Sequence, residues 1–145
     1  MKNLRHVGIV VSDIKKSLFF YKNLLSLKII SDNIESEDFI QDILDLKKSK
    51  LRTIKMSSDE GNSLVELLYF ESHKDKKRRI IMPFSLGPTH IAFEVDNLDE
   101  EYIRLKKKGT VFISAPQYSP DGRAKVVFCK DPDGTLIELV EIFKK

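Results

Sequence analysis

Four residues of this chain combine types and spacing that suit metal chemistry: His6, Glu66, His90 and Glu138. Glu138 lies in a run of β-forming residues, where alternation places it between Leu136 and Val140 on one strand face. An ionised carboxylate among apolar neighbours is costly to bury unless it is paired or bound to a metal. The sequence therefore predicts a partner for Glu138.

The segments that carry these four residues are repeated. Residues 63–67 (SLVEL) match residues 135–139 (TLIEL) in residue type, and residues 6–11 (HVGIVV) resemble residues 90–95 (HIAFEV). Each His opens an apolar strand that a helix-like stretch follows, so the order along the chain is His, Glu, His, Glu. We interpret this pattern as an internal duplication in which each copy supplies one His and one Glu.

Two imidazoles and two carboxylates offer mixed nitrogen and oxygen ligands, which suit Zn²⁺, Ni²⁺, Co²⁺, Mn²⁺ or Fe²⁺. No thiolate belongs to the set, so it favours an open site with bound water over a structural zinc site. Gly8 and Ala92 lie two residues after each His on the same strand face, and their small size leaves room over the sheet. A lone His or Glu in a strand is more often structural, but the symmetric duplication favours ligands. His73 has no repeat partner and is predicted at the surface.

The hydrophobic patterns predict a strand–helix–strand–strand–strand plan that occurs twice, which is an α+β class with a mixed sheet. In the first module, residues 1–70, a helix is expected from Ser12 or Asp13 to Leu25, with a short extra helix within residues 35–46. The strands expected in this module are 4–11, 27–30, 51–56 and 64–70.

The second module, residues 88–145, is expected to repeat the plan with a helix at residues 98–108 that ends at Gly109. Residues 115–122 are predicted to be a loop, and residues 71–87 a linker, so that the two modules form a single domain. The strands expected in this module are 89–95, 111–114, 125–130 and 136–142.

Side chains outside the duplicated set carry weaker signals. Tyr69, Tyr118 and Arg123 are candidates for lining a cavity, although core packing is the favoured interpretation for Tyr69 and solvent exposure for the other two. Glu141 lies on the strand face opposite Glu138 and is predicted to be solvated. Cys129 is predicted to be a buried strand residue, because nothing near it activates a thiolate.

Composition narrows the class of protein. Cys129 is the single cysteine, which excludes an intrachain disulfide and fits a reducing cytoplasm. The chain has no apolar run near the roughly 20 residues of a membrane span and no signal-peptide pattern, so a cytoplasmic protein without membrane contact is expected. The net charge of +3 is small and no aromatic platform accompanies the scattered lysines, which argues against nucleic acid. The basic residues 72–79 are a solvated linker or a rim that attracts an anionic substrate.

At residues 6–11, 89–93 and 131–139 the chain resembles the vicinal oxygen chelate superfamily, which has the glyoxalase/bleomycin-resistance fold. The resemblance covers nearly the whole chain. It implies two βαβββ modules that form a curved mixed sheet around one divalent metal, a small-molecule substrate and a homodimer. The metal ligands that it implies are His6, Glu66, His90 and Glu138.

The ligand set narrows the activity that the resemblance implies. Extradiol dioxygenases and fosfomycin-modifying enzymes look like enzymes with a His, His, Glu set of metal ligands. Methylmalonyl-CoA epimerase typically has a His, Gln, His, Glu set. The order found here looks like lactoylglutathione lyase (glyoxalase I). This implies a metal-dependent lyase or isomerase in which Glu138 and Glu66 are catalytic and move a proton α to a chelated carbonyl, with Glu138 the better candidate for the base.

Two positions depart from the short bacterial glyoxalases. Val10 stands where they commonly have Arg, and Phe70 where they commonly have Asn, and both of those groups help to hold glutathione. The resemblance therefore extends to the metal chemistry and leaves the thiol cofactor open, so an epimerase of an acyl thioester is an alternative. A non-catalytic small-molecule binding or resistance protein is another, but such proteins lack the ligands, and this chain has no Trp to stack on a flat drug.

Overall fold

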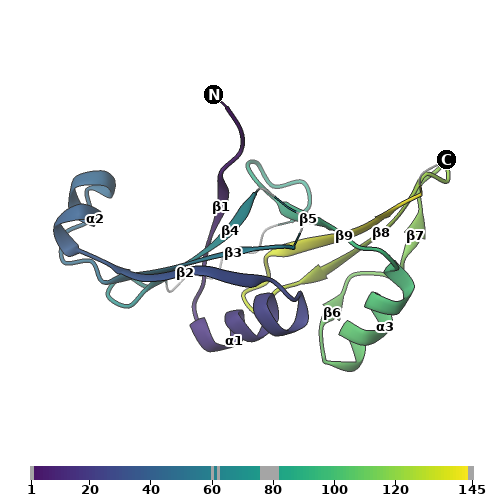
Figure 1. The fold of residues 1–145 in the computed structure, drawn as a ribbon, viewed down its shortest axis with the longest axis horizontal. Coiled ribbons are helices and arrows are strands. Elements are labelled where there is room, and N and C mark those ends of the chain that lie inside the picture. Colours follow the sequence, from purple (N-terminus) through teal and green to yellow (C-terminus); the bar gives the residue numbers. More distant parts are fainter. Residues whose placement is uncertain (1, 60, 62, 76–81, 144–145) are drawn as a thin grey trace. The chain divides into compact units, whose positions relative to one another are not determined.

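The computed structural model describes residues 2–59, 61, 63–75 and 82–143. The chain divides into two compact units, Met1–Arg78 (unit 1) and Arg79–Lys145 (unit 2), each with its own sheet (Figure 1). The predicted linker, residues 71–87, lies partly outside the described residues. No helix in the described ranges is long and apolar enough to span a membrane.

Unit 1 contains a four-stranded mixed sheet with the strand order β1-β4-β3-β2. β1 runs parallel to β4, and the other pairs are antiparallel. The order of its elements is β1 (His6–Val10), α1 (Ile14–Leu18), the π-helix η1 (Phe19–Leu24), β2 (Lys28–Glu35), α2 (Glu37–Leu44), β3 (Leu51–Ser57) and β4 (Leu64–Phe70).

Unit 2 repeats this topology. Its sheet has the order β5-β9-β8-β6, β5 runs parallel to β9, and a two-residue strand, β7, pairs with β8. The α+β class and the repeated βαβββ plan are therefore confirmed. The elements are β5 (His90–Glu94), α3 (Leu98–Lys107), β6 (Val111–Phe112), β7 (Gln117–Tyr118), β8 (Ala124–Lys130) and β9 (Leu136–Ile142).

In each unit the helix that follows the first strand packs on one face of the sheet (Figure 1). Strand alternation sends the apolar residues to that face, where they are buried with the helix. In unit 1 they are Ile9, Ile54, Met56, Val65 and Leu67, with Phe20, Tyr21 and Leu24 from η1. In unit 2 they are Val127, Cys129, Ile137 and Leu139, with Leu98 and Leu105 from α3. The opposite face of each sheet carries the residues of the predicted site.

The helix that follows the first strand of each unit begins at a polar cap. Asp13 accepts from the backbone N–H groups of Lys15 and Lys16 at 3.0 and 3.1 Å, and Asn97 accepts from that of Glu100 at 3.2 Å. These contacts satisfy donors that a helix start leaves free, and of the two predicted caps, Ser12 and Asp13, the structure uses Asp13.

The first helix differs from the prediction in its second half. Leu25 N–H donates to Phe20 O at 2.9 Å, five residues back, so the helix widens into the π-helix η1. Such a widening changes which side chains share a face. Here it brings Phe20, Tyr21 and Leu24 together into the core.

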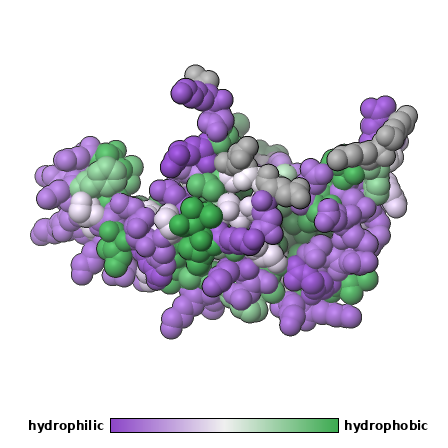
Figure 2. Space-filling view, viewed as in Figure 1, coloured by the Kyte–Doolittle hydropathy of each residue, from purple (hydrophilic) through white to green (hydrophobic). Residues whose placement is uncertain are grey.

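β2 is longer than predicted and continues through a polar stretch. Arg52 donates to Asp32 through two nitrogens at 2.7 and 2.6 Å, and Thr53 Oγ1 donates to Glu35 Oε1 at 2.6 Å. These cross-strand contacts hold β2 on β3 where the residues of β2 have low β propensity. The extra helix predicted within residues 35–46 is confirmed as α2, whose exposed Phe39, Ile43 and Leu44 contribute to the apolar surface around α2 in Figure 2.

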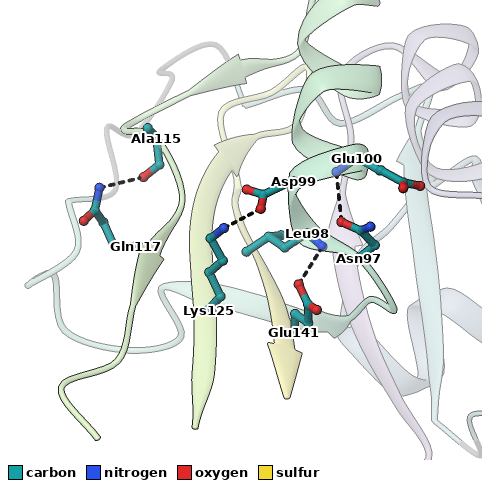
Figure 3. Close-up of polar contacts among 8 residues, drawn as sticks. All are labelled: Asn97, Leu98, Asp99, Glu100, Ala115, Gln117, Lys125 and Glu141. Carbon is teal, nitrogen blue, oxygen red and sulfur yellow. Dashed lines mark hydrogen bonds and ion pairs between the residues drawn. The ribbon is translucent and has the colours of Figure 1, made fainter. Parts of the chain in front are cut away.

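Glu141 is not the solvated residue that was predicted. Its Oε2 accepts from Leu98 N–H at 2.9 Å at the start of α3, and it lies beside the ion pair between Lys125 Nζ and Asp99 (Figure 3). Both contacts tie α3 to the strands that it covers. The hydrogen bond from Lys125 to Asp99 is the main cause that raises the pKa of Lys125.

Candidate metal centre

The first His–Glu pair lies on two neighbouring parallel strands of unit 1. His6 opens β1, and Glu66 lies on β4 opposite Gly8, on the same sheet face. His6 Nε2 is 3.2 Å from Glu66 Oε2. The Glu66 side chain is 11% exposed and that of His6 36% exposed, so the carboxylate is largely buried and the imidazole is more accessible to solvent.

The second pair repeats this arrangement in unit 2. His90 opens β5, and Glu138 lies on β9 opposite Ala92. His90 Nε2 is 3.3 Å from Glu138 Oε2. The structure thus brings each predicted Glu to its predicted His, at the same strand register in both units.

The donor atoms of each pair fit a shared metal ion. Two ligands at about 2.0–2.2 Å from one ion lie about 3 Å apart when they are adjacent in its coordination shell. The observed separations of 3.2 and 3.3 Å match that spacing. Within each unit, no third His, Cys, Asp or Glu of the described residues joins the pair to form a cluster of three.

The second ring nitrogen of each His differs in its surroundings. His90 Nδ1 lies 3.0 Å from Thr89 Oγ1, which orients the ring with Nε2 toward Glu138. His6 Nδ1 is buried and has no hydrogen-bond partner among the described residues. The imidazole of unit 2 is therefore oriented by a hydrogen-bonding neighbour, whereas that of unit 1 has Glu66 as its one polar contact among the described residues.

The residue directly across from each Glu is the largest difference between the two pairs. In unit 1 it is Lys55 on β3, whose Nζ lies 3.2 Å from Glu66 Oε1. In unit 2 it is Phe128 on β8, whose ring meets that of His90 edge to face with centroids 5.3 Å apart. Glu66 therefore has two cationic or hydrogen-bonding partners and Glu138 has one within the described residues.

A tight turn sets the register that places Glu138. Asp131 Oδ1 accepts from the backbone N–H groups of Asp133 at 2.9 Å and Thr135 at 2.7 Å, and Gly134 has a φ of 88°. These contacts close the hairpin between β8 and β9, with Lys130 opposite Leu136. The turn predicted from residues 131–134 is confirmed.

The remaining candidates lie outside the His–Glu pairs. Tyr118 is 64% exposed and stacks on Phe143, and Arg123 is close to Asp121. Cys129 is buried on the helix face of its sheet, as predicted, and burial raises the pKa of its thiol to about 12. It is therefore not a thiolate near neutral pH.

Sequence reasoning missed Lys55 and Phe128. A signal for Phe128 was available, because the turn at residues 131–134 fixes which residue of one strand faces Glu138 on the next. The loop between β3 and β4 has no comparably specific turn sequence, so the residue opposite Glu66 could not be identified in the same way.

A model of the Glyoxalase/Bleomycin resistance protein/Dioxygenase superfamily matches residues 3–139. The chain belongs to this superfamily. Lactoylglutathione lyase of Schizosaccharomyces pombe is 31% identical over 145 residues, a match that covers 94% of this chain and 46% of that protein, so the chain spans about half the length of this relative. Lactoylglutathione lyase of Salmonella typhimurium is 26% identical, with 95% of this chain and 91% of that protein covered.

Two solved structures share the fold of this chain. A glyoxalase family protein from Bacillus cereus superposes with a TM-score of 0.88 at 21% identity, covering 99% of this chain and 96% of that chain. An antibiotic binding protein from a Streptomyces species superposes with a TM-score of 0.68 at 16% identity, covering 98% and 97%. The same fold thus occurs in a protein described as a glyoxalase family member and in one described as an antibiotic binding protein.

Proposed function

We propose that this chain is a divalent-metal-dependent lyase or isomerase of the glyoxalase I type, which moves a proton at the carbon next to a chelated carbonyl. The observation that carries the proposal is the repeated pair of a His Nε2 and a Glu oxygen at the same register in both units. Relatives named lactoylglutathione lyase support it. Whether glutathione takes part is left to the substrate screen below, since Val10 and Phe70 replace groups that hold it in the resembling enzymes.

The residues that would hold the metal are His6, Glu66, His90 and Glu138, and the donor set suits Zn²⁺, Ni²⁺, Co²⁺, Mn²⁺ or Fe²⁺. A bound divalent ion supplies Lewis acidity to the substrate oxygens. We further propose that residues 1–70 and 88–145 act as the two modules of one domain, with residues 71–87 as the link. The modules pair within one chain or across a homodimer.

Glu138 is the residue to which we assign the proton transfer. Its side chain is 20% exposed and has His90 as its one described ionic partner, next to an apolar ring. Glu66 is 11% exposed and is held from both sides by His6 and Lys55. A base must move between its resting position and the substrate carbon, so the less tethered carboxylate suits that role. Glu66 serves mainly as a ligand.

Metal analysis of the untagged protein tests the proposal. Wild-type protein is expected to retain one divalent ion per chain, and His6→Ala and His90→Ala are each expected to lose it. His73→Ala is the control, because His73 lies near Ser49 and Ser72, outside the two pairs. Full metal retention in both of the first two variants would defeat the proposal.

Mixing the two variants shows which modules share a site. If the metal binds between modules of different copies, a mixture of His6→Ala and His90→Ala protein contains dimers with one intact set of ligands, and metal binding returns in part. If the metal binds within one chain, the mixture contains no more metal per chain than either variant alone. Refolding each variant alone is the control.

Assays of the same purified protein distinguish the proposed function from two alternative functions. An acyl-thioester epimerase would exchange the α-proton of acyl thioesters and leave adducts of α-ketoaldehydes with thiols untouched. A binding protein, a description borne by one superposable structure, would bind small molecules without exchanging their protons. We also propose a cytoplasmic location for this enzyme. The single cysteine is a buried free thiol, which fits a reducing compartment.

A further inference from the structure

Lys55 is where the two His–Glu pairs differ in charge. Its Nζ lies 3.2 Å from Glu66 Oε1, while the other oxygen of that carboxylate faces His6 Nε2 at 3.2 Å. The equivalent position of unit 2 is Phe128, which is opposite Glu138 as Lys55 is opposite Glu66. Unit 1 therefore adds a positive charge to its pair, and unit 2 adds an apolar ring.

We propose that Lys55 determines substrate specificity by binding a carboxylate of the substrate beside the chelated carbonyl. The proposal rests on the proposed function, because it assigns a substrate class to the same site. A Lys ammonium is a compact point charge with three donors, so it can contact Glu66 and a second anion together. A lone ammonium suits a singly charged carboxylate.

The charge of the proposed site supports an anionic ligand. Two carboxylates offset the two charges of a divalent ion and the imidazoles are neutral as ligands, so the ammonium of Lys55 leaves one positive charge in excess. The next carboxylate on this sheet face, Glu35, accepts from Thr53 Oγ1 and lies opposite Leu51, at the far end of β3. A substrate anion can supply the missing charge.

Access to Lys55 is also suited to a ligand. Its side chain is 25% exposed on the face that carries His6 and Glu66, and its neighbour on β2 is the small residue Ser31. Lys125 of unit 2 provides a contrast, since it is 10% exposed, lies on the helix face and is bound to Asp99. Lys125 is a structural cation, whereas Lys55 lies on the sheet face opposite the helix and keeps 25% of its side chain exposed.

The experiment compares two nearly isosteric ligands on Co²⁺-loaded protein. Hydroxypyruvate and dihydroxyacetone both offer a hydroxyl and a ketone on adjacent carbons, but only hydroxypyruvate has a carboxylate. Calorimetric titration gives the ratio of their affinities for the wild type, Lys55→Met and Lys55→Gln. Lys28→Met is the control with the same loss of charge on the same sheet, because Lys28 pairs with Asp59 and is 70% exposed.

We expect the preference for hydroxypyruvate to fall about tenfold or more in both Lys55 variants, the loss expected for one hydrogen bond to a charged group, and to persist in Lys28→Met. An unchanged preference in the Lys55 variants, or loss of Co²⁺ from both of them, would overturn the role of Lys55 and leave the proposed function standing. Failure of the wild type to bind Co²⁺ or any of the other candidate metals would overturn both.

Discussion

Units 1 and 2 place the same two candidate ligands, a His and a Glu, on equivalent pairs of parallel strands, yet surround them differently. Glu66 faces the ammonium of Lys55, whereas Glu138 faces the ring of Phe128. Thr89 supports His90, whereas the corresponding nitrogen of His6 has no partner among the described residues. A duplicated frame that keeps its donors and varies their neighbours fits the proposed division of tasks, with charge held in unit 1 and proton transfer in unit 2.

Exchanging each site carboxylate for its amide tests this division most strongly. We expect Glu138→Gln to retain metal, because an amide oxygen can still coordinate, and to lose about 10²–10⁴-fold in the rate of proton transfer. Glu66→Gln should lose less. The measurement is deuterium incorporation at the α-carbon in D₂O, with the substrate that a screen of α-ketoaldehyde–thiol adducts and acyl thioesters identifies. Exchange at the wild-type rate in metal-loaded Glu138→Gln would exclude Glu138 as the base.

The next largest effect concerns the two cores. Leu67 and Leu139 directly follow the two site carboxylates and are 0% and 1% exposed. Each Leu→Ala substitution should cost about 2–5 kcal/mol of unfolding free energy. The thiol of Cys129 reacts only when unit 2 opens, because burial raises its pKa to about 12 and closes access.

Thiol labelling of these two variants shows whether the units unfold together. Leu139→Ala should speed the labelling of Cys129 in either case. If Leu67→Ala speeds it equally, the two units unfold as one cooperative body. If Leu67→Ala lowers the thermal midpoint without changing the labelling of Cys129, the units are independent, and the comparison between them is one of two separate folding units.

A smaller effect is expected at the turn of unit 2. Asp131→Ala removes the carboxylate oxygen that accepts from two backbone N–H groups, which should cost about 1–3 kcal/mol. Chemical denaturation measures the loss. Asp131→Asn is the matched control, because its amide oxygen can still accept from both N–H groups, and an equal loss in both variants would contradict the role assigned to the Asp131 oxygen.

The smallest effect concerns the helix caps. The backbone N–H of Lys16, above all, holds the pKa of Asp13 below its ordinary value, whereas the cap of unit 2, Asn97, has no titratable group. A lowered folded-state pKa means that the Asp13 cap stabilises above the ordinary pKa near 3.8 and loses that contribution as the pH falls through the folded-state value.

Asp13→Asn should therefore flatten part of the fall in thermal midpoint between about pH 5 and pH 2, a window set by carboxylate pKa values. Asn97→Asp is the reciprocal variant and should steepen that fall. Thermal unfolding across this range measures both, and identical pH profiles for the wild type and Asp13→Asn would contradict the assignment.

The pairing within each unit could be predicted from sequence because the His and Glu segments are repeated with the same residue types. The neighbour of Glu66 could not, because it depends on strand register and the loop between β3 and β4 has no specific turn sequence, whereas the turn at residues 131–134 carried a signal for Phe128 opposite Glu138. The extension of β2 was hidden for a related reason. Its polar residues are held by partners on β3, such as Arg52 on Asp32, that become neighbours only after the sheet forms.

The π-helix η1 was also beyond sequence reasoning. Its residues have the spacing of an ordinary helix, and nothing in that spacing marks the hydrogen bond from Leu25 back to Phe20 that widens it. Glu141 was misassigned because alternation along β9 shows which face it is on, and not that the start of α3 lies over it.

The parallel pairing of the first and last strands gives each unit a fixed order of assembly. Within unit 1, β1 leaves the ribosome before the other strands, but its neighbour in the sheet is β4 and not β2. His6 therefore has no Glu66 beside it until α1, η1, β2, α2 and β3 have been synthesised. Once β4 has emerged, unit 1 has its complete His–Glu pair before any strand of unit 2 exists. The duplicated chain is thus a vectorial assembly in which the His–Glu pair of unit 1 is completed before that of unit 2.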